Sequence, residues 1–334
     1  MLRGMAGMVS QKLIDLFRKY YRENMIDPPE LISKREVGYM TFSGEVIRHL
    51  RVNNKFELNM LLRDAAPMHV YSSAAYYRKP DERKMPEKEW EGADLIFDLD
   101  SDHLPGAEKM SQRNMLAQIR DQTSRLVSDF LMDDFGIPRS SIKIYFSGNR
   151  GYHVHVSDDR IYRLTSDARR EITDYITGNS LDESIVRKAI SMLAIVSGGW
   201  PAVIRRELGD NANGGMIRET EIRKAIKKAR EDHSVLIDSP VTYDIHRIIR
   251  MPNTLHGKSG LIVREVPIDR LQDFDPLQEC IPEQFMDGEY DIILPEKIRS
   301  VEIGGTEAPR MPGRHRVKTY VAVYLVASGR AVFP

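Results

Sequence analysis

The sequence predicts an α/β fold, a mixed β-sheet flanked by helices, with a helical insertion subdomain. Segments with strand-like patterns and segments with helical periodicity follow one another along the chain, as this class requires. The sequence pattern from residue 164 to about residue 229 is mostly typical of helices. We therefore divide the chain into a discontinuous core, residues 1–159 and 235–334, and a helical insertion at residues 160–234.

The individual elements follow from periodicity and from the residues that end them. Residues 9–24 and 114–135 repeat apolar side chains at helical spacing, and Gly136 and Pro138 end the second helix. The prolines and charges of residues 78–91 predict a solvated loop. The predicted strands are residues 40–50, 68–71, 95–100, 142–146, 152–156 and 261–266.

Composition sets limits on compartment and partners. The 49 basic and 49 acidic residues cancel, so nucleic-acid binding would have to come from local basic patches. Cys280 is the only cysteine, which excludes an intrachain disulfide and a cysteine-based zinc site. We find no signal-peptide pattern and no run of roughly 20 apolar residues that would span a membrane. We expect a soluble, cytoplasmic protein.

The first chemical motif is the predicted strand at residues 95–100. Side chains alternate between the two faces of a strand, so Leu95, Phe97 and Leu99 are expected in the core, and Asp98 and Asp100 share the opposite face. Two carboxylates held so close repel each other unless a cation lies between them, and such oxygen ligands suit magnesium or manganese. Solvated acids at a strand end remain the alternative.

The second motif connects two predicted strands at residues 147–155. Its glycines allow backbone amides to approach an anion, while Ser147 and Arg150 offer a hydroxyl and a planar fork for phosphate oxygens. His153 and His155 alternate with valines and therefore share a strand face. A tight hairpin with a surface arginine is the alternative interpretation of this segment alone.

The third motif spans residues 238–261 and is dense in groups that bind anions. Arg250, His256 and Lys258 lie among prolines and glycines. The Gly-Lys-Ser triplet at 257–259 is not a phosphate-binding Walker A loop, because Pro252 occupies the position of the first required glycine. A basic surface loop is the alternative.

The three motifs, in this order, resemble the small catalytic subunits of archaeal and eukaryotic DNA primases. The resemblance covers about residues 30–265 and rests on Asp-x-Asp, Ser-Gly-x-Arg-Gly-x-His and a final Arg-x-Pro-x-Thr-Leu-His-x-Lys-Ser-Gly-Leu. It implies the primase catalytic core. It also implies catalytic and metal-binding roles for Asp98, Asp100 and Asp238. It implies nucleotide-binding roles for Ser147, Arg150, His153, Arg250, His256 and Arg48, with Arg78 and Lys79 in the same basic lining.

The resemblance also implies the reaction and its partners. We expect template-directed nucleotidyl transfer that synthesises primers on single-stranded DNA from nucleoside triphosphates, with a two-metal site for Mg²⁺ or Mn²⁺. A primase large subunit carrying an iron–sulfur domain is the expected heterodimer partner. Asn149 replaces an arginine of eukaryotic relatives, and the zinc knuckle of several archaeal relatives is missing, so no structural zinc is expected.

Two other functions stay open at this point. A primase-polymerase or repair polymerase of the same superfamily would share all three motifs. A histidine-triad-like nucleotide hydrolase would use residues 152–156, but that chemistry needs a third alternating histidine, and Ser157 stands at its position.

Overall fold

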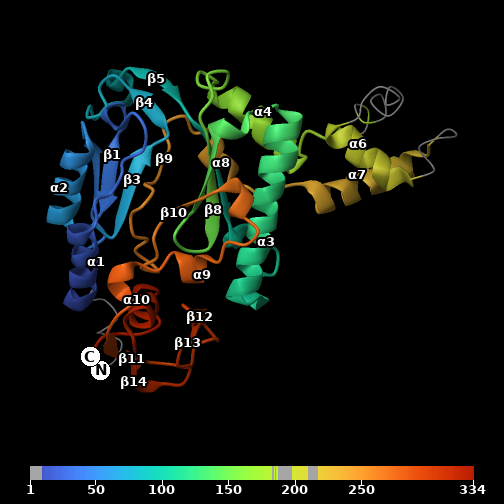
Figure 1. The fold of residues 1–334 in the computed structure, drawn as a ribbon. Helices are drawn as coiled ribbons and strands as arrows, with labels where there is room; N and C mark the ends of the chain where they lie inside the picture. Colours follow the sequence, from blue (N-terminus) through green and yellow to red (C-terminus); the bar gives the residue numbers. More distant parts are fainter. Residues whose placement is uncertain (1–9, 183, 185, 187–197, 210–216) are drawn as a thin grey trace.

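Two antiparallel sheets form the centre of the molecule, and helices cover them (Figure 1). The computed structural model describes residues 10–182, 184, 186, 198–209 and 217–334. One sheet has the strand order β2-β1-β3-β9 and the other β10-β7-β8-β6. The strands are β1 (Val37–Met40), β2 (Val46–Leu50), β3 (His69–Ser73), β9 (Ile248–Arg250), β6 (Leu95–Asp100), β7 (Ile142–Phe146), β8 (Gly151–Val156) and β10 (Arg264–Val266).

Helices cover the outer side of each sheet. The first two helices pack on each other beside β1 and β3, and the third contacts β6 and β8 (Figure 1). That third helix continues into a π-helical segment, Leu126–Asp134, and Ser111 caps its start by accepting a hydrogen bond from the Asn114 amide at 3.2 Å. The helices are α1 (Gln11–Glu23), α2 (Lys55–Ala65), α3 (Gln112–Arg125), α4 (Ser166–Thr177), α6 (Gly199–Leu208), α7 (Glu219–His233), α8 (Ser239–Tyr243), α9 (Pro276–Glu279) and α10 (Thr319–Ala327).

The predicted α/β class is confirmed, with corrections to individual elements. Every pairing between described strands is antiparallel and the strands form separate sheets, so the single mixed sheet was wrong. The predicted strand at 40–50 is a hairpin of β1 and β2, because Gly44 allows a turn at φ +87°. The predicted loop at 78–91 buries the Lys88 side chain completely, since its ammonium meets a buried carboxylate.

The predicted insertion contains α4, α6 and α7. Parts of it, including the glycine-rich break at residues 211–215, lie outside the described residues, so the domain boundaries stay a prediction. Among the described residues, no helix is both long enough and apolar enough to cross a membrane.

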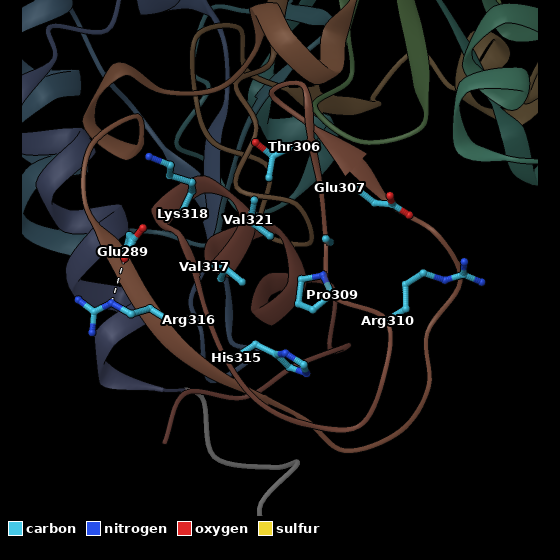
Figure 2. Close-up of a pocket in the computed structure, with 11 residues that line it drawn as sticks. Glu289, Thr306, Glu307, Pro309, Arg310, His315, Arg316, Val317, Lys318 and Val321 are labelled. Atoms are coloured by element: carbon cyan, nitrogen blue, oxygen red, sulfur yellow. Dashed lines mark hydrogen bonds and ion pairs between the residues drawn. The ribbon is translucent and has the colours of Figure 1, made fainter.

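A small unit near the C-terminus has no counterpart in the sequence analysis. Its strands β11 (Glu289–Leu294) and β14 (Gly313–Lys318) pair with each other, as do β12 (Glu302–Ile303) and β13 (Thr306–Glu307). A depression of about 560 Å³ lies on this unit, and Glu289 and Arg316 in its lining form an ion pair at 2.9 Å. Figure 2 shows the residues that line it. None of the predicted site residues lines it.

Candidate active site

Strand β6 presents two acids on one face and apolar side chains on the other. Leu95, Phe97 and Leu99 are buried in the main core, which includes the apolar face of α3. Asp98 and Asp100 therefore project together from the opposite face, as the alternation predicted. Burying apolar side chains on one face contributes roughly 1.5–3 kcal/mol for each of them, and this fixes the register that places the acids on the opposite face.

The Asp98 carboxyl lies in an unfavourable place for a negative charge. Burial, then repulsion from Asp100 and Asp238, raises its pKa from 3.8 to about 6, although Arg250 acts in the opposite direction. Asp238 reaches this position at the start of α8, where its backbone amide donates to the Asp98 carbonyl at 2.9 Å. The three predicted acids are thus neighbours in space.

The turn after β6 links Asp100 to the glycine-rich loop. Asp100 accepts a hydrogen bond from the Asp102 amide at 3.0 Å, and the Asp102 carboxylate pairs with Arg150 at 2.7 Å. Short 3₁₀ turns at Ser101–His103 and Ala107–Lys109 then lead toward α3. The acid strand and the predicted phosphate loop are therefore joined through Asp102.

The two glycine-containing loops pack against each other. Gly148 has φ +86°, and a Cβ at this position would lie 2.6 Å from the Cβ of His256, so a side chain would not fit. The Ser259 hydroxyl donates to the Gly148 carbonyl. Ser147 is buried, and its amide donates to the Gly151 carbonyl at 2.9 Å. The second and third motifs of the sequence consequently form one surface.

Two buried histidines lie within this surface as neutral rings. His153 stands directly opposite Asp98 in the β6–β8 ladder, with Nε2 3.6 Å from Asp98 Oδ1. Burial first, and then Arg250, hold the pKa of His153 and of His256 well below the usual value. In His256, Nδ1 accepts from the Lys258 amide at 3.2 Å, which leaves Nε2 to carry the proton. Each ring is suited to donate a hydrogen bond without carrying a charge.

Arg250 connects the two sheets electrostatically. It ends β9 opposite Tyr71 of β3, and it influences the pKa values of Asp98, His153 and His256. Its Nε is covered and has no hydrogen-bond partner among the described residues, and neither ring nitrogen of His153 has one. Covered polar groups without partners are costly, and ligand oxygens would satisfy them.

Arg48 and the two cations after Tyr77 are held by other contacts. Arg48 pairs with the buried carboxylate of Glu36 at 2.8 Å, and the same carboxylate pairs with Lys88 at 3.2 Å. Arg78 and Lys79 both pair with Glu89. The structure therefore does not bring these three cations into contact with the acids and histidines described above, and their nucleotide roles stay predictions.

The negative charges of the three acids suit a divalent cation, but their side chains are not already arranged to coordinate one. Among the described residues, no three His, Cys, Asp or Glu side chains lie close enough together to hold a metal ion. However, the raised pKa of Asp98 comes partly from carboxylate neighbours, and a bound cation would relieve that repulsion. Asp98 and Asp100 are the two oxygen donors that share a strand face.

Comparisons with known proteins identify the family of this chain. A family model described as DNA primase small subunit matches residues 97–268, which contain every site residue above except Arg48, Arg78 and Lys79. A DNA primase small subunit of Thermoplasma acidophilum is 82% identical, over 96% of this chain and 100% of the relative. The chain belongs to the DNA primase small subunit family. The family resemblance predicted from the three motifs is confirmed.

Other DNA primase small subunits extend the comparison. That of Thermoplasma volcanium is 58% identical over 97% of both chains, and that of Methanothrix thermoacetophila is 34% identical over 98% of this chain and 99% of the relative. A polymerase domain from Mycobacterium tuberculosis ligase D, solved in complex with DNA, has 13% identity and a TM-score of 0.42 over 80% of this chain and 84% of that chain.

Two residues of this primase small subunit adjoin the site without having been predicted from sequence. Asp102 holds Arg150, and the buried His69 meets the His256 ring edge-on, with centroids 4.8 Å apart. His69 also accepts the Gly257 amide at 3.2 Å on Nδ1. A lone histidine in a predicted strand gives no local signal of such a contact, whereas the position of Asp102, two residues after the Asp-x-Asp motif, could have suggested one.

Proposed function

We propose that this primase small subunit catalyses template-directed nucleotidyl transfer and synthesises primers on single-stranded DNA. One observation carries the proposal. An acid with a raised pKa, Asp98, faces the partnerless ring of His153, and Arg250 acts on both. Carboxylates that attract cations beside neutral and cationic donors for phosphate are what transfer of a nucleotide from a triphosphate needs.

The acids would hold the metal. Asp98 and Asp100, with Asp238 beside them, are the proposed ligands for two Mg²⁺ or Mn²⁺ ions. When bound, such ions lower the pKa of an attacking 3′-hydroxyl and neutralise the departing pyrophosphate. Since no three described side chains are already grouped for coordination, waters and phosphate oxygens would fill the remaining positions, as is common for magnesium.

The donors on the opposite wall would position the triphosphate. His153 and His256, both neutral, donate hydrogen bonds, while Arg250 supplies charge and Arg150 supplies a planar fork once it leaves Asp102. Ser147 holds the start of the glycine-rich loop, whose backbone approaches the anion. Catalysis then comes mainly from positioning and charge stabilisation.

The partners follow from the same proposal. The relatives' name, small subunit, supports a heterodimer with a primase large subunit, for which we propose an iron–sulfur domain. Single-stranded DNA and nucleoside triphosphates are the proposed substrates. We propose no structural zinc, because the stretch after β6 has no cysteine, and a cytoplasmic location.

The proposal is tested by synthesis without a primer. Purified protein is incubated with single-stranded DNA, labelled nucleoside triphosphates and Mg²⁺ or Mn²⁺. We expect labelled products on unprimed template that depend on the metal and are missing with Asp98→Asn. Extension of primed templates only would instead support a repair polymerase, and hydrolysis of nucleotides without polymer would support a nucleotide hydrolase. Either result would contradict the proposal.

A further inference from the structure

A groove of about 990 Å³ begins at the tips of the two motif loops. Arg150 and Lys258 form one part of its lining. Its other walls come from residues 108–112, from residues 299–301 and from the C-terminal end of α10 with Arg330. The groove therefore extends the candidate active site toward the C-terminal unit, which the family model over residues 97–268 does not cover.

The lining is strongly basic in a chain whose total charge is zero. Five cationic side chains and one carboxylate, Glu108, line the groove. Lys109 and Arg299 are exposed, and Arg299 donates to the Glu108 backbone carbonyl rather than to a carboxylate. In Arg330, Nη1 is covered and has no hydrogen-bond partner among the described residues. Such a concentration of positive charge attracts a polyanion.

Apolar side chains lie between these cations. Met68, Met110 and Met115 line the same groove, together with Val301. Methionine side chains adapt to varied apolar surfaces, and sites for single strands combine a basic groove along the phosphates with apolar side chains, usually aromatic, that contact the bases. Pyrophosphate or a free triphosphate would use the cations alone, so the mixed lining favours a nucleic-acid strand.

We propose that this groove binds the backbone of single-stranded nucleic acid, with Lys109, Arg299 and Arg330 as phosphate contacts. The inference rests on the proposed function, because it takes the strand to be the template, held at Lys109, Arg299 and Arg330 beside the triphosphate site to which Arg150 is assigned. It assigns binding to residues outside the three motifs, of which Arg299 and Arg330 also lie beyond the matched family segment.

The test compares a Lys109→Ala/Arg299→Ala double variant with the unaltered full chain. The control is Lys297→Ala, because Lys297 is exposed in the same segment as Arg299 but does not line the groove. Binding of a labelled single-stranded oligonucleotide is followed by fluorescence anisotropy across a salt series, without nucleotide or metal. We expect the Kd of the double variant to rise roughly tenfold, and its salt slope to fall by about 1.4, as for the loss of two phosphate contacts. The control should bind like the unaltered chain.

Two outcomes would overturn the inference. In one, the double variant binds the oligonucleotide normally but has a raised nucleotide KM, which would assign the groove to free triphosphate or pyrophosphate. In the other, neither quantity changes. Both substituted side chains are exposed, so the melting temperature should be unchanged, and Arg299→Gln provides a second variant if it is not. Failure of the unaltered chain to make primers would contradict the proposed function without altering the binding result.

Discussion

Two acids that follow the line of one face of β6, one just before the strand and one within it, have different environments. Asp94, just before the strand, is buried. Its carboxylate pairs with the Arg35 guanidinium at 2.6 Å and accepts a hydrogen bond from the Tyr76 hydroxyl at 2.8 Å. Asp98, further along, has the neutral His153 ring at 3.6 Å and carboxylates for neighbours. Asp94 therefore belongs to a buried ion pair with Arg35. The charged form of Asp98 is unfavourable, and a bound cation would stabilise it.

The difference separates a structural role from a functional one. Arg35 also donates to the carbonyls of Ser73 and Ala74, so its pair with Asp94 joins the two sheets. Buried charges that satisfy each other hold a fold in one arrangement, but they leave nothing for a ligand. Beside Asp98, by contrast, the ring nitrogens of His153 and the Nε of Arg250 have no hydrogen-bond partner among the described residues, and metal and triphosphate are proposed to bind there.

The largest expected effect is on catalysis. Asp98→Ala or Asp100→Ala should reduce primer synthesis by at least roughly 1,000-fold, because the proposed metal ions lose a ligand at the charge-stabilising centre. Circular dichroism and the melting temperature should show that the fold is kept. Primer synthesis at the unaltered rate in either variant would contradict the metal assignment.

Substitution of Asp94 should change the free energy of unfolding. Asp94→Ala leaves the Arg35 guanidinium buried without its carboxylate and should lower the free energy of unfolding by about 3–5 kcal/mol. The control is Asp15→Ala, which removes an exposed ion pair with Arg18 and should change stability by less than about 1 kcal/mol. Denaturant titration measures both, and equal effects would show that burial of the pair is unimportant.

Substitutions of the phosphate donors should affect the nucleotide more than the template. Alanine at Arg150, His153, Arg250 or His256 removes a hydrogen bond to a charged group, worth about 1.5–3 kcal/mol, so the ratio kcat/KM for nucleotide should fall roughly 10- to 100-fold. Affinity for single-stranded DNA should stay near that of the unaltered chain. Loss of template binding with normal nucleotide dependence would refute the assignment.

The smallest effect concerns the metal-free protein. The pKa of Asp98 is raised in the folded state, so this group favours folding below about pH 4 and opposes it as the pH rises through 6. Asp98→Asn should therefore stabilise the metal-free chain by about 1–3 kcal/mol near pH 8, and the gain should disappear near pH 4. Thermal unfolding in the presence of a chelator measures it, and destabilisation near pH 8 would contradict the pKa direction.

Sequence patterns predicted the parts of the site that depend on neighbours in the chain. Strand alternation gave the limits of β6 and the shared face of its acids, and the order of the motifs gave the family. The burial of Lys88 and the position of His69 beside His256 depend on partners distant in sequence, which periodicity does not report. The pairing of Asp102 with Arg150 likewise depends on how β6 and β8 align.

Measuring Mn²⁺ binding tests most directly whether Asp98 and the carboxylates beside it bind a cation. Electron paramagnetic resonance would follow free Mn²⁺ for the unaltered chain, for Asp98→Asn and for Asp273→Asn, which removes an exposed carboxylate outside the site. We predict that the unaltered chain and Asp273→Asn bind Mn²⁺ more tightly near pH 8 than near pH 5, because Asp98 loses its proton around pH 6, and that Asp98→Asn loses this binding. Equal Mn²⁺ affinity in Asp98→Asn and the unaltered chain would contradict the account.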